Sequence, residues 1–123
     1  MKQIASYFYI LAALSALCGM AWGIQMSASG DHLLSPAHGH LNLLGFVAMA
    51  VFGTYYALSP AAAQSRIATV HLVLAVLSVV VLIPGIVFAI TGQGEVLAKI
   101  GSILAVVSML VFTFVVAKHR IPA

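Results

Sequence analysis

The run IATVHLVLAVLSVVVLIPGIVFAI, residues 67–90, decides the fold class of this chain. It contains no Asp, Glu, Lys or Arg, and it exceeds the roughly 20 apolar residues that a helix needs to cross a bilayer core about 30 Å thick. Three further apolar runs of similar length accompany it in the sequence, at residues 4–26, 33–58 and 96–117. Together they predict four transmembrane helices.

These runs predict an all-α membrane protein in which residues 1–123 form one transmembrane domain. The breaks between them contain turn residues, at 27–31, 59–60 and 91–94. Because such short loops join helices that run antiparallel, we expect a bundle or arc. The composition is 63% hydrophobic and 6% charged, whereas a water-soluble domain carries roughly a quarter charged residues. This excludes an ordinary soluble domain and a nucleic-acid binder with a basic patch.

The distribution of charge predicts the orientation in the membrane. Lysine and arginine flank the first and last runs and occupy the middle loop, at Lys2, Arg66, Lys118 and Arg120. By the positive-inside rule, both termini are cytoplasmic, and the loops with Asp31 and Glu95 lie outside. Lys99, near the outer end of the fourth run, is the exception and can snorkel. We therefore expect a multi-pass protein of a bacterial-type inner (plasma) membrane.

The segment PAHGHLN, residues 36–42, is the strongest candidate for a site, because ionisable groups at membrane depth are costly. Successive residues of an α-helix are about 100° apart, so His38 and His40 point to nearly opposite sides. His38 shares its face with Asn42 and a stripe that offers room for a flat ligand, namely Gly45, Met49, Phe52, Gly53 and Tyr56. His40 shares its face with a plain apolar stripe, namely Leu44, Val47, Val51 and Thr54. The pair predicts two sites, whose remaining ligands come from other helices, other chains or a cofactor.

The other histidines receive different predictions. A lone intramembrane histidine is usually explained by a hydrogen bond to a neighbouring helix, whereas a His-x-His with Asn one turn on favours ligation. His71 lies roughly 10 Å or more in depth from the pair, so we expect a packing or interface residue at the inner boundary. His32 and His119 are predicted to be solvated. Gln25 reaches the depth of the pair and either bonds to it or snorkels to water.

Several function classes lack the residues they need. The sequence has no Gly-rich phosphate loop, Ser-His-Asp arrangement or paired carboxylates, which argues against hydrolases and transferases. Its spans contain no Asp or Glu, so vectorial proton transport is not expected. Cys18 is the sole cysteine, which excludes an internal disulfide and a cysteine-based zinc site. Trp22 and the pair Tyr55-Tyr56 are typical of membrane-interface aromatics.

The sequence Ala37-His38-Gly39-His40, followed by Gly45 and Gly53, resembles subunit I of the haem–copper oxidase superfamily. This superfamily includes the cbb3-type oxidases and the nitric oxide reductases. Its subunit I has twelve helices in three four-helix arcs, and the tenth helix carries A-H-x-H before an apolar, Gly-spaced run. Val70-His71-Leu72, with Pro84 further on, is similar to the start of the eleventh helix. The resemblance covers the chain as one arc.

The resemblance implies roles for the histidines. His38 corresponds to the axial ligand of the active-site haem and His40 to that of the electron-transfer haem, whereas His71 corresponds to no ligand. A homotrimer would replace the three arcs. The chain departs from the family because it has no adjacent His-His pair or other copper-ligand set. It also has residues 92–95, GQGE, where the family has the arginine pair that neutralises haem propionates.

Three hypotheses follow. The first is a redox or ligand-binding membrane protein that holds b-type haem (haem b) through His38 and His40, with Asn42 beside them. The second is a copper-binding or copper-handling protein that uses the same histidines, with soft ligands from Met20, Met26 or Met49. The third is a non-catalytic assembly subunit of a respiratory complex. Without a complete binuclear site in one chain, an enzyme is the less favoured class, and the substrate and the electron donor stay open.

Overall fold

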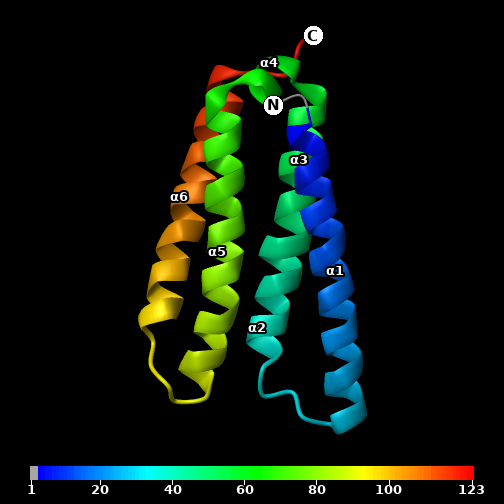
Figure 1. Ribbon diagram of the computed structural model, residues 1–123, viewed down its shortest axis with the longest axis vertical. Coiled ribbons are helices and arrows are strands. Elements are labelled where there is room, and N and C mark those ends of the chain that lie inside the picture. Colours follow the sequence, from blue (N-terminus) through cyan, green and yellow to red (C-terminus); the bar gives the residue numbers. More distant parts are fainter. Residues whose placement is uncertain (1–2) are drawn as a thin grey trace.

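The computed structural model describes residues 3–123, within which every regular element is a helix (Figure 1). The elements are α1 (Ile4–Ser29), α2 (Ser35–His40), the π-helix η1 (Leu41–Ala48), α3 (Met49–Leu58), α4 (Pro60–Gln64), α5 (Arg66–Ile90) and α6 (Val96–Lys118). Over these described residues, four helical spans are long and apolar enough to cross a membrane: Ile4–Ser29, Ser35–Leu58, Arg66–Ile90 and Val96–Lys118. The predicted all-α membrane fold is therefore confirmed, while Lys2 lies outside the described residues.

Residues with special backbone chemistry end the helices. Gly30, with φ of 71°, closes α1 through its N–H, which donates to the carbonyl of Met26, because glycine adopts this left-handed conformation without strain. Ser59 ends α3 in an extended conformation and caps α4, where Pro60 occupies the first turn. The sequence predicted a plain loop at this point, and the Ser-Pro pair instead starts the short helix α4.

The spans form two helix hairpins that stand side by side (Figure 1). The first pairs α1 with α2, η1 and α3, and the second pairs α5 with α6. Small residues let α5 and α6 approach closely: a Cβ on Gly101 would lie 2.5 Å from the Cα of Leu82, and a Cβ on Gly85 would lie 2.5 Å from the backbone N of Ala98. Glycine at a helix interface is the usual means of such close packing in membranes.

The most deeply buried side chains gather at the end of the bundle that carries α4. They come from α1, from the end of α3, from α4, from the start of α5 and from the end of α6, and include Ile4, Phe8, Tyr56, Ala62, Ala68 and Val115. The main buried core therefore lies at this end, while α5 also contacts α2 and η1 further along the bundle.

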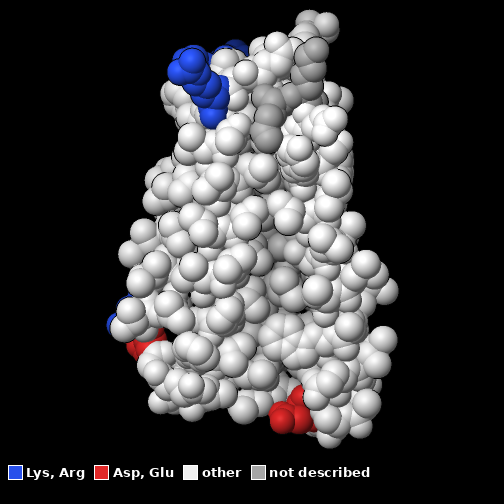
Figure 2. Space-filling model, in the orientation of Figure 1, with Lys and Arg blue, Asp and Glu red and all other residues white. Residues whose placement is uncertain are grey.

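The two ends of the molecule differ in charge. Arg66 begins α5 and Lys118 ends α6, at the end where Figure 2 shows lysine and arginine side chains. Asp31 and Glu95 lie in the loops at the opposite end, where Figure 2 shows acidic side chains. Lys99 lies at that acidic end, with its Nζ 3.6 Å from Oε2 of Glu95. The predicted separation of charge is thus present in the fold.

Candidate functional site

His38 lies on the side of α2 that faces α1. Its Nε2 is 2.8 Å from the carbonyl oxygen of Gly19, and its ring is half-buried beside the edge-on indole of Trp22, at 5.9 Å between ring centroids. A carbonyl oxygen can only accept a hydrogen bond, so Nε2 carries the proton and, in the neutral ring, Nδ1 holds the lone pair. Asn42 therefore donates to the His38 carbonyl, 3.1 Å away, rather than to Nε2.

Two glycines on α1 make room for this arrangement. A Cβ on Gly19 would overlap the Asn42 amide, and a Cβ on Gly23 would lie 3.3 Å from Nε2 of His38. The G-x-x-x-G spacing of these residues is a known signal for close helix packing in membranes. This spacing is visible in the sequence and marks where α1 approaches the candidate site, which was not predicted above.

His40 lies on a different side of α2 and is exposed. Its Nδ1 is 2.7 Å from the carbonyl oxygen of Pro36, one turn earlier in the same helix. The Nδ1–H therefore donates to this carbonyl, and the neutral ring leaves Nε2 as an unprotonated lone pair. Metal-ligating histidines typically have this arrangement, with one ring N–H held by a carbonyl and the other nitrogen free to bind.

A π-helix follows the pair directly, where the sequence predicted a regular α-helix. η1 covers Leu41–Ala48, and the Asn42 side chain donates to the carbonyl of His38, which in an α-helix would accept from the backbone N–H of residue 42. Short polar side chains compete with the backbone in this way. π-Helical turns occur frequently at functional sites, so this irregularity coincides with the candidate residues.

The two predicted faces are present, but one prediction about them is wrong. The stripe that follows His38 is buried at Gly45, Met49, Phe52, Gly53 and Tyr56, and it offers no room for a flat ligand. Its small residues instead allow α1 to fill the space: a Cβ on Gly45 would lie 2.8 Å from Oγ of Ser15, and a Cβ on Gly53 would lie 3.1 Å from Cβ of Phe8.

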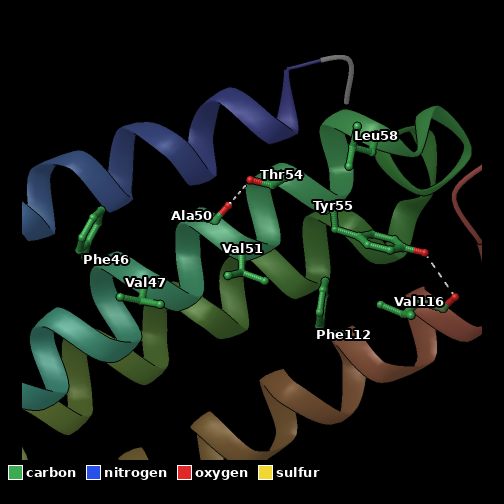
Figure 3. A pocket seen from close by; sticks show the side chains of 9 residues that line it. All are labelled: Phe46, Val47, Ala50, Val51, Thr54, Tyr55, Leu58, Phe112 and Val116. Atoms are coloured by element: carbon green, nitrogen blue, oxygen red, sulfur yellow. Dashed lines mark hydrogen bonds between the residues drawn. The ribbon is translucent and has the colours of Figure 1, made fainter.

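The face that carries His40 is open to the surroundings along η1 and α3. Beyond His40, toward α4, this face forms the wall of a groove of about 540 Å³ between α3 and α6 (Figure 3). Nine side chains line this groove: Phe46, Val47, Ala50, Val51, Thr54, Tyr55, Leu58, Phe112 and Val116. The hydroxyls of Thr54 and Tyr55 donate to the carbonyls of Ala50 and Val116, so the groove presents an apolar surface.

His71 lies in the core near α4, far from the pair along the bundle. It is fully buried, and its Nδ1 is 2.9 Å from the hydroxyl of Tyr56. Three phenyl rings surround it, with centroids 5.2 Å away for Phe8, 4.5 Å for Phe52 and 5.5 Å for Phe112. Its Nε2 has no hydrogen-bond partner among residues 3–123. The prediction of a packing residue is confirmed.

The remaining polar predictions have mixed outcomes. Tyr56 is buried against His71, so its assignment to the membrane interface is wrong. Tyr55 donates to the carbonyl of His119 at 2.7 Å and thereby fastens the chain after α6 to α3. Gln25 lines a small pocket beside Trp22 and Asp31 at the acidic end of the bundle.

The potential soft ligands lie in different surroundings. Met26 and Met49 are buried, whereas Met20 on α1 is exposed. Within residues 3–123, no group of three or more His, Cys, Asp or Glu side chains could hold a metal ion. The described residues therefore offer individual imidazoles rather than a complete ligand set.

Comparison with family models, with curated proteins and with solved structures finds no match for this chain. The fold and the site define an all-α membrane protein with two histidines on different sides of one span.

Proposed function

We propose that this protein holds a b-type haem in the membrane through intramembrane histidines and has a redox or ligand-binding role. The observation that carries the proposal is the hydrogen bond from Nδ1 of His40 to the carbonyl of Pro36, at 2.7 Å. It sets the tautomer in which Nε2 is free to bind a metal, on a side chain that points out of the bundle.

A haem fits the single exposed imidazole of His40 better than a bare metal ion does. A bare ion needs a set of protein ligands, and the part of the chain that the structure describes offers no cluster of them. A porphyrin supplies four nitrogens itself, so that one or two imidazoles complete the iron coordination. When bound, the haem would supply one-electron chemistry or an open position for a small ligand. The A-H-G-H resemblance to the haem–copper oxidase superfamily supports the same group.

The protein's own residues would orient the group. The Pro36 carbonyl holds the His40 ring, and the Gly19 carbonyl on α1 holds the His38 ring. Asn42 donates to the backbone carbonyl of His38 within the same span. His38 is the second proposed ligand, through Nδ1 or after release of Nε2 from Gly19. Because α1 fills the stripe that follows His38 but leaves the His38 ring half-buried, the proposal places haem beside the exposed His40 ring, between copies of the chain. A homotrimer would supply His38 and His40 to each centre from neighbouring copies.

A visible spectrum tests this proposal most simply. Protein purified in mild detergent and supplied with haem should show a Soret band that shifts on reduction, with a fixed ratio of haem to protein. Metal analysis should find iron and no stoichiometric copper. Copper without haem would favour the copper-handling alternative, and absence of both metals would favour the assembly-subunit alternative.

A further inference from the structure

Lys99 departs from the separation of charge between the two ends of the bundle. It lies at the acidic end of the bundle, where its Nζ is 3.6 Å from Oε2 of Glu95 and the two side chains are 74% and 71% exposed. Exposed ion pairs at i and i+4 contribute little to stability. Both charged groups are therefore available to a molecule that approaches this end.

This ion pair stands at the rim of a groove between the end of α5 and the start of α6. The groove has a volume of about 560 Å³ and is lined by Ala89, Glu95, Ala98, Lys99, Ser102 and Ile103. The groove exists because several of these side chains are small. Its wall is largely apolar because the Ser102 hydroxyl donates to the carbonyl of Ala98.

The depth of the groove matches one membrane leaflet. Its lining runs from Glu95, which precedes α6, to Ile103, and these eight steps of 1.5 Å make about 12 Å. Half of a bilayer core is about 15 Å thick. A hydrocarbon chain lying along Ala98 and Ser102 would therefore bring its headgroup to the level of the ion pair.

We propose that this groove binds a phospholipid with a phosphoethanolamine headgroup. The Lys99 ammonium would bind the phosphate, and the Glu95 carboxylate would accept hydrogen bonds from the primary ammonium, while one acyl chain occupies the groove. Charge-assisted contacts of this kind are among the stronger hydrogen bonds. The pairing of a cation and an anion 3.6 Å apart complements a zwitterion.

The charges distinguish this lipid from the common alternatives. A phosphocholine headgroup has the same net charge, but its quaternary ammonium has no N–H to donate to Glu95. A phosphoglycerol headgroup offers no cation to Glu95, and its net negative charge is repelled by the carboxylate. The inference is independent of haem binding, because the groove lies on α5 and α6 and contains none of the proposed ligands.

Native mass spectrometry tests the proposal. The full-length protein in mild detergent is offered equal amounts of phosphatidylethanolamine, phosphatidylcholine and phosphatidylglycerol with identical acyl chains. We expect the bound ethanolamine lipid to exceed the choline lipid by roughly tenfold, the factor that one charge-assisted hydrogen bond supplies. Equal retention of these two lipids, or preferential retention of the glycerol lipid, would overturn the proposal.

Single substitutions test the roles of the two charged residues separately. Glu95→Gln should abolish the preference for ethanolamine over choline, because it removes the acceptor of the primary ammonium. Lys99→Gln should weaken all three lipids alike, because each contains a phosphate. The double reversal E95K/K99E keeps both charges and should keep the preference. Glu95 makes no side-chain cap bond to α6, so these changes leave the helix start intact.

A last pair of variants locates the acyl chain. Ser102→Phe should fill the groove and remove the bound lipid, whereas Val47→Phe in the α3–α6 groove should leave it unchanged. If Ser102→Phe still preferred the ethanolamine lipid over the choline lipid, the assignment of the acyl chain to this groove would be wrong. A second result would also contradict it: a second copy of the chain, and no lipid, bound at this groove and lost in Ser102→Phe.

Discussion

Two hydrogen bonds to backbone carbonyls determine what the candidate histidines can do. In His40 the bond to Pro36 leaves Nε2 as the free nitrogen, and in His38 the bond to Gly19 leaves Nδ1. The two histidines, two positions apart, thus present different free ring nitrogens on different sides of one helix. This difference follows from the i, i+2 spacing together with the close approach of α1.

Tyr56→Phe should destabilise the protein by about 1 to 3 kcal/mol, because it leaves Nδ1 of His71 buried without its partner. Unfolding in a series of detergent mixtures with increasing denaturing strength would measure this cost. Tyr9→Phe is the matched control: it removes a tyrosine hydroxyl that bonds to Thr54 at an exposed position, and it should cost less. Equal losses in the two variants would show that the Tyr56–His71 contact contributes nothing special.

At the scale of the elements, glycine positions decide how the helices pack. Gly101 and Gly85 bring α5 and α6 together, while Gly19 and Gly23 bring α1 onto α2 and η1. The hydrophobic effect does not drive helices together inside a lipid phase, so these close contacts supply much of the association.

Gly101→Ala should weaken the α5–α6 hairpin by about 1 to 3 kcal/mol, because the added Cβ would lie 2.5 Å from the Cα of Leu82. The same unfolding measurement applies. Gly39→Ala provides the control, since a Cβ there meets nothing within 4 Å, and it should be neutral or slightly stabilising. A neutral Gly101→Ala would contradict the close packing of these helices.

The sequence predicts the spans well because each depends on local apolar length alone. It also predicts the two faces of α2, because helical periodicity fixes them. The π-helix depends on the competition of Asn42 for the His38 carbonyl, which periodicity does not reveal. The burial of Tyr56 against His71 depends on how four helices pack together, which the spacing of residues within one helix cannot predict. The same holds for the filling of the His38 face by α1.

At the scale of the whole molecule, the separation of charge implies an orientation, which we propose to be cytoplasmic for both termini. In a Cys18→Ser background, a cysteine at Ser29 should react with an impermeant reagent in intact cells, and a cysteine at Ala61 should not. Both positions are exposed in the fold, so burial cannot explain the difference. The reverse pattern would overturn the orientation.

The proposed homotrimer is a second prediction at this scale. Native mass measurement in mild detergent should find three copies, because a haem on the exposed face of His40 needs another chain to cover it. A monomer that still carries haem would contradict the shared site. In that case His40 would bind haem without a neighbouring copy.

We propose above all that His40, together with His38, holds the metal centre. The most direct test is the haem content per chain of His38→Ala, His40→Ala and His71→Leu, purified and supplied with haem under the same conditions. We predict that His40→Ala abolishes bound haem, that His38→Ala lowers it strongly, and that His71→Leu retains the wild-type ratio. Full haem content in His40→Ala would contradict the proposed site.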